Sequence, residues 1–130
     1  MTKLLLTLTA FAGLGASSLA GPLDGVWINT DPATRSIPKI EISGTRFVWW
    51  GKTHPKDTKY GPARLTLLGD STGDASPDKY GYVTHDAKFA DKTYFLKRVG
   101  DQLVLEYMTV FKDGSKRANN LQTVTFQKEP

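Results

Sequence analysis

The residues best suited to chemistry lie in Thr53–Asp57, which reads Thr-His-Pro-Lys-Asp. A histidine three residues before an aspartate is a pattern in which the carboxylate orients the imidazole as a base, or in which both side chains bind a metal ion. Metal sites usually need three or four ligands, and the chain has only one other histidine, His85. We therefore predict no metal site and no cofactor. For His54 and Asp57 three interpretations remain: a hydrogen bond across a tight proline loop, which is the simplest, contact with a ligand, or catalysis in a hydrolase.

Other catalytic classes have less support. A glycosidase needs two facing carboxyl groups, one with a raised pKa. Glu41 and Glu106 each stand between apolar neighbours in strand-like segments, so we expect both to alternate outward to solvent. The sequence contains no Gly-x-Ser-x-Gly elbow, no His-Glu-x-x-His motif and no phosphate-binding glycine loop. These observations predict a protein that is not an enzyme.

Tryptophan is the stronger indication of a binding function. Trp49 and Trp50 are consecutive, and the alternation of a strand must place them on opposite faces. One packs in the core. The other either contacts a ligand or partner or is covered by one of two neighbouring loops, Asp31–Ser36 or Thr53–Tyr60. The sequence does not decide which tryptophan points inward.

A second aromatic pair and a third tryptophan complete the candidates. Tyr80 and Tyr82 share one face of a strand, because a single glycine separates them. They either stack on the ring of a ligand or pack beneath the loop Gly69–Lys79, which its composition predicts to be mobile. Trp27 is expected in the core, where it plugs a barrel end. Arg117 or Arg35 is expected to lie across its ring as a cation–π cover.

The elements that must position these side chains are strands. From Gly21 onward, the β-branched and aromatic residues Val, Ile, Thr, Phe, Tyr and Trp number 36, against 21 for Ala, Leu, Glu, Gln and Met. Such residues suit the half-buried surface of a sheet, and no segment repeats apolar residues at helical spacing for three turns. The pattern predicts eight strands, with short turns at Gly44-Thr45 and Gly100-Asp101. The predicted strands are Gly25–Thr30, Ile37–Ser43, Arg46–Lys52, Pro62–Leu68, Tyr80–Asp86, Thr93–Val99, Gln102–Phe111 and Asn120–Gln127.

Sequential strands joined by short turns favour an up-and-down meander. Eight such strands close into a small antiparallel β-barrel, which removes exposed edges. Its interior is then filled by side chains or holds one small ligand. We therefore predict an all-β fold, with one barrel domain over residues 21–130.

Residues 1–20 are typical of a secretory signal peptide. Lys3 gives a basic start, Leu4–Leu14 is apolar, and small residues precede a cleavage point after Ala20. The apolar stretch is too short and wrongly flanked for a membrane span. Cleavage removes Lys3 and lowers the net charge from +4 to +3. The remaining sequence has no block of like charges that would favour binding to nucleic acid. The chain lacks cysteine, so neither a disulfide nor a lipoprotein anchor is available, and we predict a secreted or periplasmic monomer.

The opening segment reads Gly25-Val26-Trp27-Ile28-Asn29. It resembles the first strand of the calycin barrels, the lipocalins and avidins, in which a Gly-x-Trp closes one end. A longer pattern comprises Trp27-x-Asn29-x-Asp31-Pro32-x-Thr34-Arg35-x-Ile37, Lys39-Ile40-x-Ile42, Trp50-Gly51-x-x-His54-Pro55-x-Asp57, Tyr60-Gly61, Phe111-x-Asp113-Gly114-Ser115-x-Arg117 and Phe126. This pattern resembles a family of small, uncharacterised secreted bacterial domains, which implies a barrel-like fold and no particular activity. Relatives of that kind typically carry two cysteines where this chain has Thr53 and Thr58. If those cysteines bind something, that role is lost here, and if they only staple the loop, the fold is kept.

Two functions follow from these predictions, with catalysis third. The first is binding of a small molecule, a carbohydrate or an aromatic ligand, at the barrel mouth. The second is interaction with a protein partner, such as inhibition of an exported hydrolase, through the loops Thr53–Tyr60 and Gly69–Lys79. An empty barrel interior favours the first and a packed interior the second. The residues predicted to bind are Trp49, Trp50, Tyr80, Tyr82, His54 and Asp57.

Overall fold

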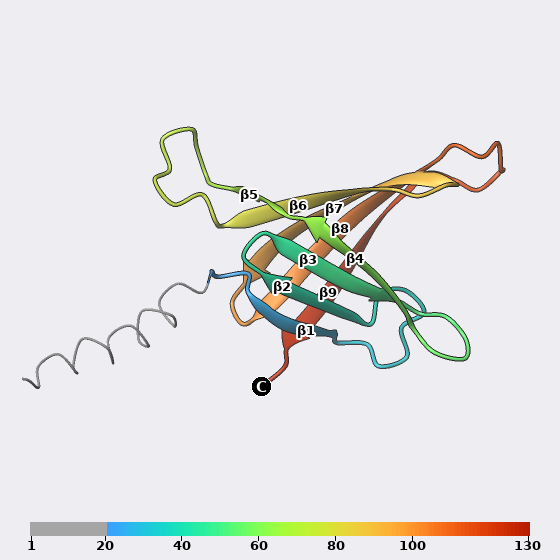
Figure 1. Cartoon of the computed structure of the whole chain (residues 1–130), viewed down its shortest axis with the longest axis horizontal. Coiled ribbons are helices and arrows are strands. Elements are labelled where there is room, and N and C mark those ends of the chain that lie inside the picture. Colours follow the sequence, from blue (N-terminus) through green and yellow to red (C-terminus); the bar gives the residue numbers. More distant parts are fainter. Residues whose placement is uncertain (1–20) are drawn as a thin grey trace, which may run out of the picture.

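The computed structural model describes residues 21–130, and the regular structure in this range is entirely β-strand. The predicted signal peptide lies outside the described residues. Nine antiparallel strands form one sheet curled into a nearly closed barrel (Figure 1), so the predicted all-β barrel is confirmed. Within residues 21–130, no helix has the length and apolar character needed to cross a membrane. The strands are β1 (Gly25–Asn29), β2 (Lys39–Ser43), β3 (Arg46–Gly51), β4 (Thr58–Arg64), β5 (Thr66–Leu68), β6 (Tyr80–Asp86), β7 (Ala90–Val99), β8 (Gln102–Phe111) and β9 (Asn120–Lys128).

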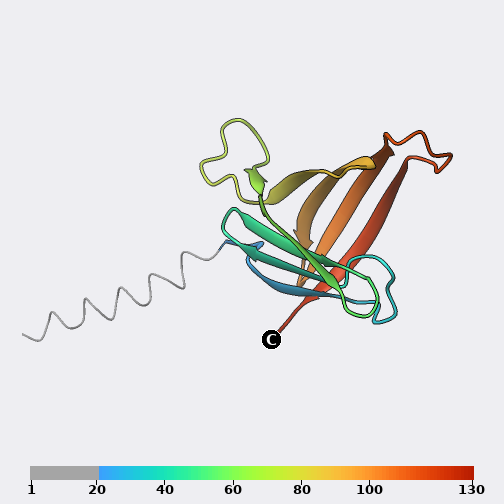
Figure 2. The same cartoon turned by 45° about the vertical axis from the view of Figure 1, so that its right-hand side comes forward.

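The strands follow one another around the sheet as an up-and-down meander (Figures 1 and 2). The order is β4-β3-β2-β1-β9-β8-β7-β6-β5, so all neighbours except β1 and β9 are consecutive in the chain. At that junction Trp27 pairs with Lys128. The predicted turns at Gly44 and Gly100 join β2 to β3 and β7 to β8, and both glycines have the positive φ that favours glycine. β7 begins at Ala90, earlier than predicted, because its pairing with β8 continues to that residue.

The fourth predicted strand, Pro62–Leu68, is two strands in the structure. Strand structure begins at Thr58, inside the segment Thr53–Tyr60 that was predicted to be a connector. β4 pairs with β3, whereas β5 pairs with β6 on the opposite edge of the sheet. Between them the side chain of Leu65 is buried, and its backbone N–H donates to the carbonyl of Thr45 (2.8 Å). The chain therefore crosses at Leu65 from one edge of the sheet to the other, which brings the edges together.

One end of the barrel is filled by side chains, and we refer to it as the closed end. The hairpins β2–β3 and β7–β8 lie there, and the buried indole of Trp27 donates its Nε1–H to the carbonyl of Leu23 (3.0 Å). Trp27 is in the core, as predicted. The expectation that Arg117 or Arg35 covers its ring is wrong, because both residues belong to loops at the other end. Arg98, in β7 just before its hairpin, has its Cζ 5.7 Å from the ring centre. The core comprises Leu23, Trp27, Ile37, Ile40, Ile42, Phe47, Trp49, Leu65, Val83, Tyr94, Leu96, Leu103, Leu105, Tyr107 and Phe126.

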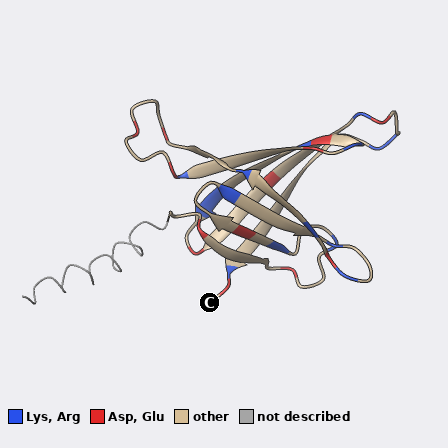
Figure 3. Cartoon of the chain, viewed as in Figure 1, with Lys and Arg blue, Asp and Glu red and all other residues tan. Residues whose placement is uncertain are grey.

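The opposite end carries the candidate site, and we refer to it as the open end. Four connecting segments lie at this end: residues 30–38, 52–57, 87–89 and 112–119. They lie toward the right of Figure 1, and several carry lysine and arginine, drawn in blue in Figure 3. The barrel thus has two different ends, one filled by apolar side chains and one bordered by charged loops.

Candidate ligand-binding cavity

A cavity of about 810 Å³ opens at the open end of the barrel. It is lined by inward-facing side chains of β3, β4, β6, β7, β8 and β9 and by residues of the loops beside them. Pockets that hold small molecules commonly have volumes of about 300–1,000 Å³. The barrel is therefore packed at one end and hollow at the other.

One wall of the cavity is a group of aromatic rings from three strands. The rings of Trp49 and Tyr60 stack within 18° of parallel, with centroids 5.5 Å apart, and His85 meets Trp49 edge-on at 5.3 Å. Such offset and edge-on arrangements are the favoured ones for aromatic pairs. Gly61, with φ of 91°, permits this approach, because a Cβ there would lie 2.8 Å from the carbonyl oxygen of Phe47 and 3.3 Å from the Trp49 ring. The wall offers a rigid aromatic surface.

A second aromatic pair lines the cavity from β7 and β8. The rings of Tyr94 and Tyr107 stack at 5.6 Å and 14°, and Tyr94 also lies 5.4 Å from Trp49. Burial raises the pKa of the Tyr94 phenol, and the neighbouring Tyr107 acts in the same direction, so Tyr94 stays neutral at physiological pH. The Tyr107 hydroxyl donates to Gln122 Oε1 (3.1 Å) and accepts from the Ser36 hydroxyl (2.6 Å). These bonds fix the ring in the wall of the cavity.

Asn29, a buried polar residue at the end of β1, positions the loop 30–38 over the cavity. Its side-chain Nδ2 donates to the carbonyl of Ile37 (2.9 Å), and its Oδ1 accepts the backbone N–H of Asp31 (2.8 Å). One buried amide therefore holds both ends of the loop that carries Arg35 and Ser36. Buried polar groups that are fully hydrogen-bonded specify a single arrangement, and this one defines the rim of the cavity.

His85 is the titratable residue of the aromatic wall. Its Nδ1 is buried and has no hydrogen-bond partner among the described residues. Burial lowers the pKa of His85, the Lys92 ammonium lowers it further, and Asp86 opposes this in part. The imidazole is therefore neutral at pH 7 and contributes to the wall as a ring rather than as a charge.

Among the six residues predicted to bind, Trp49 lines the cavity. It is the inward-facing tryptophan of β3, with 4% of its surface exposed. Trp50 faces outward and is half-buried, with Lys39 Nζ 4.6 Å and Lys59 Nζ 5.6 Å from the centre of its ring. These two lysines from neighbouring strands make cation–π contacts with the ring. A separate hollow of about 720 Å³ lies beside it, lined by Trp50 together with His54 and Asp57 of the loop 52–57.

His54 and Asp57 lie in the loop 52–57, outside the cavity. His54 is exposed, and the Asp57 carboxylate lies 3.6 Å from the Lys52 ammonium. Within the described structure no hydrogen bond or ion pair joins His54 to Asp57, so the predicted bond across the proline loop is replaced by others. The hydroxyls of Thr53 and Thr58 bond to each other at 2.7 Å and close the loop.

Tyr80 and Tyr82 share one face of β6, as predicted, and that face is the outside of the barrel. Gly81 points inward and is buried. The Tyr80 hydroxyl donates to Asp70 Oδ1 (3.0 Å), and its ring stacks on Phe95 at 6.1 Å. Tyr82 is 36% exposed. The predicted set therefore does not converge on one ligand, since Trp49 faces the cavity and these tyrosines face away from it.

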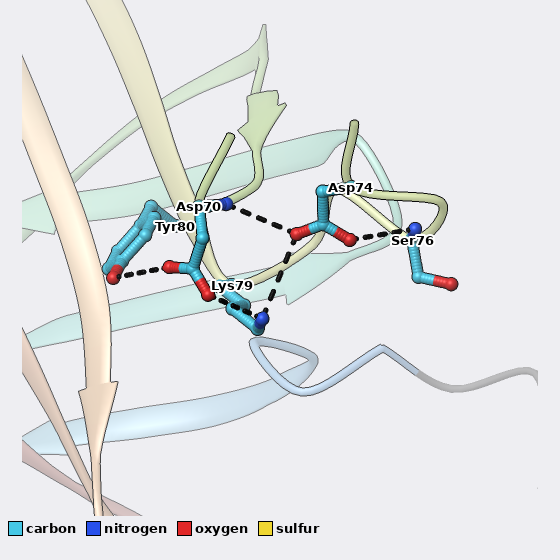
Figure 4. A network of polar contacts seen from close by, with 5 residues as sticks. All are labelled: Asp70, Asp74, Ser76, Lys79 and Tyr80. Atoms are coloured by element: carbon cyan, nitrogen blue, oxygen red, sulfur yellow. Dashed lines mark hydrogen bonds and ion pairs between the residues drawn. The ribbon is translucent and has the colours of Figure 1, made fainter. Parts of the chain in front are cut away.

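The loop Gly69–Lys79 beside Tyr80, predicted to be mobile, is crossed by polar contacts (Figure 4). Asp74 accepts the backbone N–H groups of Ser76 (2.9 Å) and Asp70 (3.1 Å), and these bonds lower the pKa of its carboxyl. The Lys79 ammonium donates to Asp70 Oδ2 (2.6 Å), which lowers the pKa of Asp70. This network ties the loop to the start of β6.

Five aromatic residues of the cavity were missing from the predicted set: Tyr60, His85, Phe89, Tyr94 and Tyr107. Alternation along β8 carries part of the signal, because Tyr107 shares the inward face of that strand with Leu103 and Leu105. Alternation fixes the face of a strand, and it does not show that rings from β4, β6, β7 and β8 meet at the same height in the barrel.

Comparisons of the chain with protein-family models, with curated proteins and with solved structures gave no match. The resemblance to small secreted bacterial domains therefore stays a prediction. In the part of the chain that the structure describes, no three histidine, aspartate or glutamate side chains are grouped so that they could hold a metal ion.

Proposed function

We propose that this protein is an exported binding domain that holds a small, ring-containing molecule in the cavity at the open end, without catalysing a reaction on it. The observation that carries this proposal is the pair of stacked ring systems, Trp49 with Tyr60 and Tyr94 with Tyr107, around a cavity of about 810 Å³. Burial of about 100 Å² of ligand ring against such surfaces contributes about 2.5 kcal/mol. Further gain comes from ring–ring geometry.

The polar residues of the cavity support the same proposal. Ser36, Tyr107 and Gln122 form a chain of hydrogen bonds at its edge, and Gln122 is held in turn by Asn120 (3.0 Å). Their positions are fixed before a ligand arrives, so binding need not order them. Preorganised groups of this kind raise affinity by lowering the entropic cost of association.

The alternative function, a protein-binding module, has less structural support than ligand binding. The loops expected to contact a partner, Thr53–Tyr60 and Gly69–Lys79, lie at opposite ends of the molecule in Figure 1. One partner would have to span the barrel to contact both. A hydrolase that uses His54 and Asp57 has the least support, because Asp57 pairs with Lys52 and not with His54.

Nuclear magnetic resonance of the three tryptophan indole N–H groups tests the proposal. Trp27 lies at the closed end, Trp50 on the outer face and Trp49 at the cavity, so each reports on a different region. Titration with 2-naphthamide, 2-naphthoate and maltose covers neutral rings, charged rings and sugars. We expect at least one probe to move the Trp49 resonance saturably while Trp27 stays in place. If Trp49 does not respond to any of them at millimolar concentration, the proposal fails.

A matched pair of variants distinguishes the cavity from the outer face. Tyr60→Ala removes a ring from the cavity wall, and Tyr82→Ala removes an exposed ring from the outside of β6. We expect Tyr60→Ala to weaken probe binding about tenfold, equivalent to about 1.4 kcal/mol, and Tyr82→Ala to leave it unchanged. Equal losses in both variants would place the binding site elsewhere.

A further inference from the structure

The charged residues around the cavity are strongly unbalanced. Four cationic side chains line it, from Arg35, Lys52, Lys88 and Lys92, against one carboxylate, that of Asp86. These residues belong to the loops at the open end and to the strand ends beside them (Figure 3). Over the whole chain, 17 lysines and arginines stand against 13 aspartates and glutamates, a far more even ratio. The excess of positive charge is therefore a local property of the open end.

Ion pairs remove part of that charge and leave three cations. Asp86 forms an ion pair with Lys112, and Lys52 pairs with Asp57 at 3.6 Å. Arg35, Lys88 and Lys92 have no ion pair with any carboxylate of the described residues, 21–130. The cavity therefore presents three uncompensated positive charges beside its aromatic walls.

Of these three cations, Lys92 is the one whose side chain is partly buried beside the aromatic rings. It is half-buried in β7, opposite His85 in β6, and its Nζ lies 5.2 Å from the centre of the Phe89 ring. Burial lowers the pKa of Lys92, and the nearby Arg117 acts in the same direction. An ammonium group held half-buried without a carboxylate partner at the edge of a partly apolar cavity is unfavourable, and an anion bound beside it offsets this.

We infer that the ligand of this cavity is an aromatic anion, with its ring against the walls formed by Trp49 and Tyr107 and its carboxylate, sulfonate or phosphate group facing Lys92. This inference rests on the proposed function and adds the charge of the ligand to it. Arg35 and Lys88, both exposed, steer the anion toward the cavity, while Lys92 contacts it directly. Charge-assisted hydrogen bonds are about twice as strong as neutral ones, so the anionic group determines which ring compounds bind.

Isothermal titration with 2-naphthoate and 2-naphthamide tests the inference, because the two probes share a ring system and differ in charge. We expect 2-naphthoate to bind about tenfold more tightly at low ionic strength. Raising the salt from about 0.02 M to about 0.5 M should remove most of this difference, since such salt screens partly exposed charges. Equal affinities overturn the inference and leave the proposed function standing. Absence of binding by both probes defeats the inference, and if maltose also leaves the Trp49 resonance unchanged, the proposed function fails with it.

Three variants locate the charge that is responsible. Lys92→Gln should abolish the preference for 2-naphthoate while leaving the affinity for 2-naphthamide within about twofold, and Lys92→Arg should retain the preference. Arg46→Gln is the control, because Arg46 is an exposed residue of the β2–β3 hairpin at the closed end. A preference that survives Lys92→Gln, or that is lost equally in Arg46→Gln, contradicts the assignment. Unchanged binding of 2-naphthamide shows that each variant is folded.

Discussion

Asn29 is the residue on which the position of the cavity rim depends, and its replacement by alanine should both destabilise the barrel and loosen the rim. The side chain is 8% exposed and makes two hydrogen bonds, to the carbonyl of Ile37 (2.9 Å) and from the N–H of Asp31 (2.8 Å). Each such bond contributes about 1 kcal/mol, and the buried groups left behind add a desolvation cost. We expect a loss of about 2–3 kcal/mol in the free energy of unfolding.

The assay for Asn29→Ala is urea unfolding followed by tryptophan fluorescence, which gives the midpoint and the slope m together. Asn119→Ala is the matched control, because Asn119 is exposed and its Oδ1 accepts one N–H, that of Phe111 (2.8 Å). We expect the control to lose about 0.5 kcal/mol or less. Asn29→Ala should also weaken 2-naphthoate binding, since the loop carrying Arg35 is no longer held. A loss below about 0.5 kcal/mol in Asn29→Ala would refute the role given to this residue.

Three further predictions concern the barrel wall and the loop Gly69–Lys79. Burial lowers the pKa of His85 from its ordinary 6.5, so the unfolded chain binds a proton at higher pH than the folded one. The free energy of unfolding should therefore fall as the pH drops below about 6.5. His85→Gln should flatten this part of the plot of urea midpoint against pH. Gly81→Ala places a Cβ 2.7 Å from Leu65 Cδ1 in the core. This overpacking should lower the free energy of unfolding by about 2 kcal/mol in the same urea assay. An unchanged midpoint would show that the Leu65 side chain moves aside without cost. Asp74→Ala removes the acceptor of two backbone N–H groups, so limited proteolysis within the loop should be faster while 2-naphthoate affinity stays the same; unchanged cleavage would mean that the network does not order the loop.

Most of the fold could be predicted because turn chemistry and alternation act locally. Glycines at the β2–β3 and β7–β8 turns and alternating residues in β8 gave the right hairpins and faces. β4 and β5 could not be separated from sequence, because the break at Leu65 depends on which sheet edge each half meets. The start of β4 at Thr58 was also missed, because the first residues of this strand are polar and exposed and are held by pairing with β3 rather than by burial.

The two tryptophans of β3 show why the site was harder to predict than the fold. Trp49 has Phe47 as its neighbour on one face of the strand, and Trp50 has Val48 on the other. All four are apolar, so hydrophobicity assigns neither face to the interior. The structure decides through the lysines of β2 and β4, which lie over Trp50 and give it shelter on the outside.

Contacts between distant parts of the chain account for the remaining differences. Arg98 covers Trp27 because the β7–β8 hairpin folds back to the closed end, and neither residue carries a local sign of this. Likewise, Tyr60, His85 and Tyr94 meet only through the stagger of three strands, β4, β6 and β7. Such convergence follows from the register of the sheet, which single-strand patterns do not contain.

The central claim is that a ring-shaped ligand lies between the aromatic walls at the open end. Nuclear Overhauser effects between the protons of bound 2-naphthoate and the protein test it most directly. The account predicts contacts to the rings of Trp49 and Tyr107 and to the side chain of Lys92. Contacts to Tyr80 and Tyr82 on the outer face instead, or saturable binding without any contact to Trp49, would contradict it.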